Sequence, residues 1–415
     1  MRVHMCAMPA RTPGPLTAAS GWEPVFYKNR DFTMNHIGLG RRQFSVALGA
    51  AVVGALPAAR AQGESRIVLG QSAAFSGPAA QLGIQFHQGA KLFFDQLNAQ
   101  GGIGRRMVEI RTLDDGYEPD RCAENTRKFI DEEVFALFGY IGTPTSLAAL
   151  PLLTQAKVPF FAPFTGAEAL RQPFNRLVFH VRASYFDETA LIVRQLTNLG
   201  VKKIAVFHQN DAYGKAGLDG VTRALAEQKL SPVATATVER NSVDVKSAVD
   251  KLVAARPDAV VQISAYAAAA AFVRAARKAG FGGTFYNVSF VGTQALADEL
   301  GKDGAGVVVS QVVPSPYQPS RQITREFLEA IKKGGDKVQA NYSSMEGYLA
   351  ARVFAEGLRQ AHAGGKLSRD GLITGLESIG TQVISGFPVS FSATSHTASK
   401  FVEMSMLTGD GRVRT

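Results

Sequence analysis

The sequence is poor in cysteine, has no apolar run long enough to cross a membrane comfortably, and lacks the short motifs of common catalytic sites. Of its two cysteines only Cys122 lies beyond residue 61, so that part of the chain cannot form an internal disulfide. Neither GxGxxG nor the Walker pattern follows the first expected strand, and GxSxG, HExxH and Cys-x-x-Cys are absent. These absences argue against the enzyme classes that the motifs mark.

The histidines beyond residue 61 do not repeat at the spacing of metal ligands. They are His87, His180, His208, His362 and His396. Cys122 has no histidine near it in sequence. We therefore expect no catalytic residue, no metal site and no cofactor.

Half of the formal net charge of +10 lies in the first 61 residues, which hold seven of the 45 Lys and Arg and two of the 35 Asp and Glu. No run of Lys or Arg exceeds two residues. The balance of charge in the rest of the chain argues against a nucleic-acid partner.

Residues 34–61 have the features of an export signal. Arg41 and Arg42 precede an apolar stretch, and Ala59-Arg60-Ala61 supplies a small-x-small cleavage pattern. The segment resembles a twin-arginine signal with cleavage after Ala61, which predicts a periplasmic protein.

Met34 lies seven residues before the arginine pair, the distance expected of a short charged leader. Residues 1–33 show no period and are rich in Pro, Thr and Arg. We interpret Met34 as the true start and residues 1–33 as a non-native or disordered leader. A start at Met1 with a long charged region is the alternative.

The remaining chain alternates short apolar runs with helical stretches, which predicts an α/β fold with parallel sheets flanked by helices. The first series of expected strands covers residues 66–70, 107–113, 135–139, 158–162 and 177–181. The second covers residues 203–208, 233–238, 259–263, 284–288 and 306–311. Two series of similar size indicate two similar doubly wound lobes.

The lobes are expected to be joined by a hinge of two or three crossings. The prolines of residues 314–317 cannot continue a central strand, so the chain should return there to the first lobe. We assign residues 65–182 and 314–380 to the first lobe, and residues 185–311 and 381–415 to the second. Such a hinge allows closure over a ligand.

The stretch from residue 135 to residue 166 is the expected centre of the ligand site. Thr143, followed by Pro144, has the pattern of a helix N-cap, and Thr165 with Glu168 has the spacing of a capping box. Two helix N-termini would then follow two adjacent parallel strands. Their oriented N–H groups favour a carboxylate, although ordinary capping alone would also explain each threonine.

Several sequence features in order along the chain resemble the branched-chain amino acid (Leu/Ile/Val) binding family of periplasmic solute-binding proteins. The features are Ser76-Gly77-Pro78, the Asn98 to Gly104 segment, Asp114-Asp115, Asn210 to Gly214, Arg274 to Gly280 and Glu346-Gly347-Tyr348. The resemblance covers residues 65–410. It implies a monomer that binds a small molecule in a cleft between two lobes and serves an ABC permease in the inner membrane.

The resemblance also implies which residues contact the ligand. The carboxylate would be held by Thr143 and by the backbone of Phe164, Thr165 and Gly166, while Tyr213 and Tyr266 would be aromatic contacts from the second lobe. When the second lobe closes, we expect Tyr185 and Asn287 to join these contacts. Ser76 and Leu82 complete the expected set, with Leu82 where the family often has an aromatic ring.

One departure from the family pattern bears on specificity. Family members that bind α-amino acids present an acid after the strand near residue 288, whereas this chain reads Asn287-Val288-Ser289. A buried ammonium without a counter-charge costs several kcal/mol, so an amide or an organic or aromatic acid is at least as consistent with the sequence as an amino acid. Asp187 or Asp211 could supply the acid, but both also fit helix caps.

Two other functions fit the same architecture. A sensor that passes its signal to a membrane receptor would have identical lobes, and an α/β enzyme would share the layers, because fold does not fix function. The absence of catalytic motifs disfavours the enzyme.

Overall fold

The computed structural model describes residues 66–334 and 337–415 of the chain. The predicted leader, the start at Met34, the arginine pair and the cleavage site all lie outside these residues. Within them, no helix combines the length and hydropathy needed to cross a membrane.

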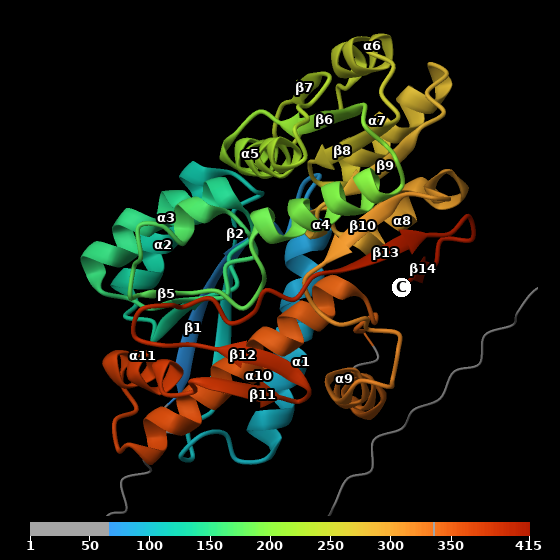
Figure 1. The fold of residues 1–415 in the computed structure, drawn as a ribbon. Helices are drawn as coiled ribbons and strands as arrows, with labels where there is room; N and C mark the ends of the chain where they lie inside the picture. Colours follow the sequence, from blue (N-terminus) through green and yellow to red (C-terminus); the bar gives the residue numbers. More distant parts are fainter. Residues whose placement is uncertain (1–65, 335–336) are drawn as a thin grey trace, which may run out of the picture. The chain divides into compact units, whose positions relative to one another are not determined.

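A first parallel sheet of five strands has the order β2-β1-β3-β4-β5. Its strands are β1 (Ile67–Ala73), β2 (Val108–Asp114), β3 (Ala136–Phe138), β4 (Phe160–Phe161) and β5 (Val178–Phe179). The helices that follow in sequence are α1 (Ala80–Ala99), α2 (Pro119–Asp131), α3 (Thr143–Ala156) and the 3-10 turn η1 (Glu168–Leu170). In Figure 1, α2 and α3 lie to one side of this sheet and α1 to the other.

A second sheet has the order β14-β13-β10-β9-β8-β6-β7. Its parallel strands are β6 (Ile204–Gln209), β7 (Thr235–Val238), β8 (Ala259–Ile263), β9 (Thr284–Asn287) and β10 (Val308–Gln311). Two antiparallel strands extend it, β13 (Glu403–Leu407) and β14 (Val413–Arg414). Its helical segments are α4 (Tyr185–Asn198), α5 (Ala212–Glu227), α6 (Lys246–Ala254), α7 (Tyr266–Lys278), η2 (Ser289–Val291), α8 (Thr293–Leu300) and η3 (Gly301–Gly304).

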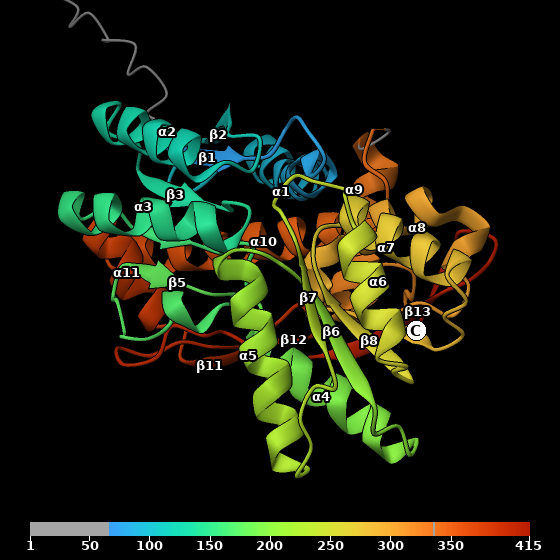
Figure 2. The same cartoon turned by 90° about the horizontal axis from the view of Figure 1, so that it is seen from above.

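Three connections between the sheets can be followed in the described residues. The chain passes from β5 to α4, from β10 back to α9 (Gln322–Gly334), and from the hairpin β11 (Thr381–Ile384) and β12 (Phe387–Ser390) to β13. Helices α10 (Tyr342–Ala363) and α11 (Arg369–Glu377) lie between the last two connections. Figure 2 shows the two groups of strands and helices from above.

The C-terminal segment is divided between the two groups. Strands β13 and β14 join the second sheet, but Ser385 in the β11–β12 turn donates to Glu326 of α9, and the backbone of His180 pairs with residues 396 and 398. The β11–β12 hairpin therefore contacts α9, whereas β13 and β14 belong to the second sheet.

Aromatic rings form the core between the first sheet and its long helices. The Phe354 ring of α10 lies 5.1 Å from Phe161, 5.7 Å from Phe138 and 6.3 Å from Phe94, measured between centroids. Helices α1 and α10 pack against each other over this layer. The opposite face of the sheet is covered by α2 and α3 through residues such as Phe129 and Leu153.

Most expected elements are present within a few residues of their predicted bounds, but α11 was missed and both caps of the 135–166 stretch were wrong. Helix α3 begins at Thr143, and Gly142 occupies the N-cap position with φ 105° and no side-chain cap. No helix begins at Gly166. The next helical segment is the 3-10 turn η1, which begins at Glu168 with Ala167 at its N-cap position. Each threonine hydroxyl is instead used in a tertiary contact.

We predict that Phe354→Ala lowers the free energy of unfolding by about 3–5 kcal/mol, because it leaves a cavity among several rings. The matched control is Phe174→Ala, since the Phe174 side chain is 41% exposed and its loss should cost under about 1 kcal/mol. Denaturant unfolding of both variants checks this. Equal losses would contradict the assigned core.

Candidate functional site

Three hydroxyl groups meet where the first sheet and the first connection come together. Thr143 Oγ1 lies 2.6 Å from Thr165 Oγ1, and Thr165 Oγ1 donates to the Tyr185 hydroxyl at 3.3 Å. Thr165 Oγ1 also accepts from the backbone N–H of Ala167. All three side chains are buried. We call Thr143, Thr165 and Tyr185 the hydroxyl cluster.

The N-terminus of α3 places backbone N–H groups beside the hydroxyl cluster. The helix has no side-chain cap at Gly142, so its first-turn N–H groups are not satisfied by a capping residue. The Ser146 hydroxyl in the same turn is buried and has no hydrogen-bond partner among the described residues. Unpaired donors and the positive end of the helix dipole both favour an anionic group here.

Aromatic rings from the second sheet cover the hydroxyl cluster. The Tyr213 ring of α5 lies 5.5 Å from Tyr185, and Phe290 of η2 lies 4.4 Å from Tyr213. Phe290 also packs against Phe164 and Tyr117 of the first group, at 5.7 and 5.8 Å. The Tyr213 hydroxyl is buried and unpartnered in the described part of the chain.

Burial keeps these phenols neutral. It raises the pKa of Tyr185 to about 12 and the pKa of Tyr117 and Tyr213 well above the usual value for tyrosine. A neutral phenol retains its O–H and can donate to an anion.

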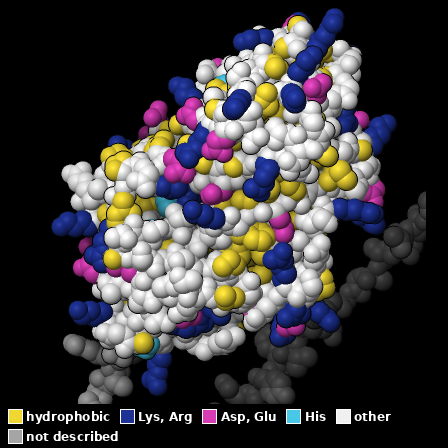
Figure 3. Space-filling model, viewed as in Figure 1, with side chains coloured by type: hydrophobic (Ala, Val, Ile, Leu, Met, Phe, Trp, Pro, Cys, Tyr) yellow, Lys and Arg dark blue, Asp and Glu magenta, His cyan; other side chains and the backbone are white. Residues whose placement is uncertain are grey.

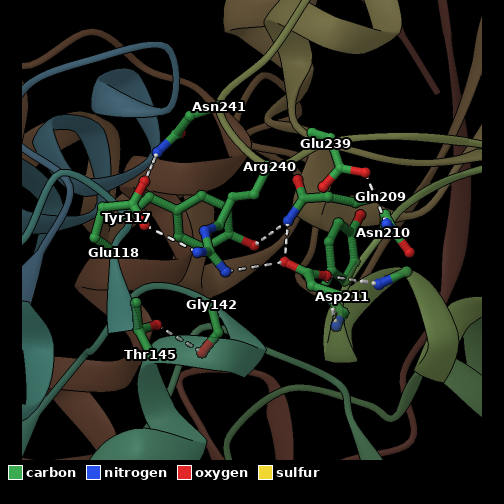
Figure 4. A network of polar contacts seen from close by, with 12 residues as sticks. Tyr117, Glu118, Gly142, Thr145, Gln209, Asn210, Asp211, Glu239, Arg240 and Asn241 are labelled. Atoms are coloured by element: carbon green, nitrogen blue, oxygen red, sulfur yellow. Dashed lines mark hydrogen bonds and ion pairs between the residues drawn. The ribbon is translucent and has the colours of Figure 1, made fainter. Parts of the chain in front are cut away.

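Polar contacts also join the two groups of elements directly, as Figure 4 shows. Gln209 at the end of β6 donates to the Tyr117 hydroxyl at 3.2 Å. Arg240 donates to Glu118 at 2.9 Å, and Asn241 donates to the same carboxylate at 2.7 Å. Gln209 ends β6, Arg240 and Asn241 follow β7, and all three meet the loop after β2. The two groups of elements are therefore in contact across this face.

A buried ion pair lies behind the hydroxyl cluster. Arg182 binds Glu346 of α10 through two hydrogen bonds of 2.8 and 2.9 Å, and its guanidinium carbon lies 4.1 Å from the centre of the Phe164 ring. Burial opposes the charge of Arg182, but the carboxylate of Glu346 more than compensates, and the net effect raises the pKa of Arg182.

A second buried carboxylate reaches the segment where the sequence has no acid. Glu188 of α4 accepts hydrogen bonds from the backbone N–H of Ser289 at 2.7 Å and from its hydroxyl at 3.1 Å. Ser310 donates to it at 2.6 Å. Burial raises the pKa of Glu188. The two other acids considered from the sequence have capping roles, Asp187 for α4 and Asp211 for α5.

Six of the residues expected at the site come together: Thr143, Phe164, Thr165, Gly166, Tyr185 and Tyr213. The carbonyl of Gly166 accepts from the backbone N–H of Tyr185, and a Cβ on Gly166 would lie 2.6 Å from that nitrogen. A side chain at position 166 would therefore displace Tyr185.

Leu82 and Tyr266 form a separate contact between the two groups. A Cβ on Gly292, where φ is 80°, would collide with Leu82 and would lie 3.7 Å from Tyr266 Cδ1. The Tyr266 hydroxyl accepts from the backbone N–H of Gln81 at 3.4 Å.

Ser76 and Asn287 have their hydrogen-bond partners elsewhere. Ser76 donates to Asp114 at 2.5 Å on the surface. Asn287 accepts from Gln262 and donates to the carbonyl of Val308 within the second sheet. Sequence reasoning missed Tyr117, Glu188, Gln209 and Phe290, because each depends on a contact between distant segments.

The described residues contain no group of histidine, cysteine and carboxylate side chains that could hold a metal ion. A site made of hydroxyls, helix N–H groups and rings can bind and enclose a polar solute.

The chain matches the family model described as periplasmic binding protein over residues 66–411. A Brucella abortus relative named Leu/Ile/Val-binding protein homolog 7 is 27% identical over 331 residues, which cover 74% of this chain and 80% of the relative.

Two solved structures are also similar. One is described as a possible leucine/isoleucine/valine-binding protein from Rhodopirellula baltica, with 34% identity, a TM-score of 0.81 and coverage of 85% of this chain and 96% of that one. The other is a substrate-binding periplasmic protein from Ralstonia solanacearum, with 31% identity, a TM-score of 0.78 and coverage of 84% and 99%.

We predict that Glu346→Gln destabilises the protein by about 3–5 kcal/mol, because it leaves the Arg182 charge buried without its partner. Replacing both residues, as Arg182→Met with Glu346→Leu, should recover part of that loss. Thermal or denaturant unfolding measures both. If the double variant is as unstable as the sum of its single changes, the two side chains do not act as a pair.

Proposed function

Because the chain belongs to the periplasmic binding protein family, we propose that it captures a small carboxylate-bearing solute between its two lobes and delivers it to the permease of an ABC importer. The family is one of substrate-binding proteins rather than enzymes, and its name implies a periplasmic location. Export by the twin-arginine route, cleavage after Ala61 and a monomeric state are parts of the same proposal.

The observation that carries the proposal is the hydroxyl cluster at the uncapped start of α3. Thr143 and Thr165 belong to the first group of elements, and Tyr213 reaches them from the second. A carboxylate at this point would accept from hydroxyls and helix N–H groups without a cationic side chain. The Ser146 and Tyr213 hydroxyls, which lack protein partners among the described residues, supply further donors.

Among carboxylate-bearing solutes, Glu188 favours those with an amino group. Its carboxylate is buried beside Ser289, at the position where the sequence departs from amino acid binders of the family. Glu188 is close enough to Tyr185 and Tyr213 to influence the ionisation of both phenols. Within the protein, the negative charge of Glu188 is balanced by two hydroxyls, one backbone N–H group and the more distant Arg182. The ammonium group of a ligand would offset this buried charge.

The proposed closure of the two lobes follows from the way the ligand contacts are divided between them. The first lobe alone offers Thr143 and Thr165, and the second lobe adds Tyr213 and Phe290 only when the lobes meet. A ligand shifts the protein toward the closed arrangement through the contacts that exist only there. The contacts of Gln209, Arg240 and Asn241 across the same face would stabilise the closed form.

We predict that Thr143→Ala combined with Thr165→Ala abolishes binding of carboxylate ligands at the hydroxyl cluster, such as leucine and 4-methylpentanoate. The measurement is a thermal-shift screen of leucine, leucinamide and 4-methylpentanoate, since a ligand at 100 times its Kd adds about 2.7 kcal/mol of stability. Thr222→Ala with Thr374→Ala, at exposed positions of α5 and α11, is the matched control. Unchanged affinity in the first pair would remove the proposed anchor.

We predict that Glu188→Gln reduces the preference for leucine over 4-methylpentanoate by about tenfold or more, because it removes the charge that faces the ammonium group. Calorimetry on both ligands gives the ratio of their Kd values. If wild-type protein binds 4-methylpentanoate more tightly than leucine, Glu188 does not serve an ammonium group, and organic acids are the solutes.

A further inference from the structure

A cavity of about 480 Å³ lies beside the first connection and is separate from the hydroxyl cluster. Its walls come from three places: η1 with the loop to β5, the first turn of α4 with the last turns of α5, and the connection from β12 to β13. None of the residues proposed to contact the solute lines it. We call it the Arg171 cavity, after the buried cation in its wall.

Arg171 is 8% exposed and has no carboxylate within 4 Å among the described residues. Its guanidinium donates to Thr397 Oγ1 at 3.1 Å and to the carbonyls of Arg182 and Ala183 at 3.1 and 3.3 Å. These bonds use three of the five N–H groups of an arginine, and Nε has no partner. Burying such a charge without a carboxylate in direct contact is costly, and burial lowers the pKa of Arg171 to about 10, although the charges of Glu168 and Asp187 act in the opposite direction.

The charged groups that line the cavity balance in number: Arg171, Arg223 and Lys400 face Glu168, Asp187 and Glu227. Asp187 is engaged by Ser184 in the capping box of α4, and Glu227 lies 3.8 Å from Arg223. Glu168 and Asp187 act on Arg171 without forming a salt bridge with it, and Lys400 has no partner in the described part of the chain. His180 and His396 add no charge near neutral pH, because burial lowers the pKa of each.

The cavity also has apolar walls and more room than an inorganic ion needs. Phe174 and Phe186 line it together with Leu170. Its volume falls within the range of pockets for small organic ligands, and polar side chains make up most of the rest of its lining. On the face seen in Figure 3, Lys and Arg side chains are interspersed with Asp and Glu and with apolar side chains.

We propose that the Arg171 cavity is a second binding site, which takes a small organic carboxylate. The carboxylate lies against the guanidinium of Arg171, with the Lys400 ammonium group at the rim. The apolar body of the ligand packs against Phe174 and Phe186. Such a ligand gives Arg171 the direct carboxylate contact that none of the described residues provides.

The test uses 4-fluorobenzoate and its neutral isostere 4-fluorobenzamide, followed by fluorine NMR and calorimetry on the wild-type chain. We expect saturable binding of the carboxylate and none of the amide at equal concentration. The comparison also separates a specific site from general salt effects on stability, which do not saturate.

Four variants locate the binding. Lys400→Gln should weaken it about three- to fivefold through the loss of one exposed charge, and Phe174→Ala by a similar factor through the loss of ring contact. Both positions are at the surface, so these variants should fold. Arg171→Gln should abolish the binding. The Thr143→Ala, Thr165→Ala pair should leave it unchanged.

Two outcomes overturn the proposal. One is that no saturable binding of 4-fluorobenzoate is found. The other is that binding disappears in the threonine pair and persists in Lys400→Gln and Phe174→Ala, which would put the carboxylate at the hydroxyl cluster and support the proposed function instead. If Arg171→Gln does not fold, the two surface variants decide the question.

Discussion

The buried pair of Arg182 and Glu346 is the interaction on which the candidate site depends most. Arg182 lies in the first connection between the sheets, and Glu346 lies in α10, which packs along the first sheet. Their bidentate contact fixes the connection just before Tyr185, and the guanidinium supports the Phe164 ring from behind. Both charges are almost completely buried, so neither is stable there without the other.

The hydroxyl cluster lies where this connection meets the end of the first sheet. Tyr185 is the first residue of α4, and the capping box of Ser184 and Asp187 determines where that helix begins. Thr165 is followed by Gly166, whose carbonyl accepts a hydrogen bond from the backbone N–H of Tyr185. The Tyr185 side chain belongs to α4, a helix of the second group. Because only a few residues of chain separate it from β5, it lies in contact with the end of the first sheet. A ligand at the cluster would touch the hinge as well as both lobes.

The alternation of strands and helices could be predicted from the sequence because each element depends on local signals. The capping pattern of Ser184 and Asp187 and the Asp211 cap were confirmed because their partners lie two or three residues away. Thr143 and Thr165 have the same kind of pattern, and there the prediction was wrong. Their hydroxyls find each other across 22 positions of sequence, and this tertiary contact outweighs local capping.

The carboxylate of Glu188 at the proposed solute site shows a limit of reasoning from positions along the sequence. The sequence near residue 288 has no acidic residue, but that statement describes only the loop after β9. In the fold, a carboxylate arrives from Glu188, about a hundred residues earlier, and occupies the donors of Ser289. A site requires a charge at a point in space, and any segment that passes the point can supply it. Ser289 of that loop then has a direct physical role, because it holds the carboxylate that comes from α4.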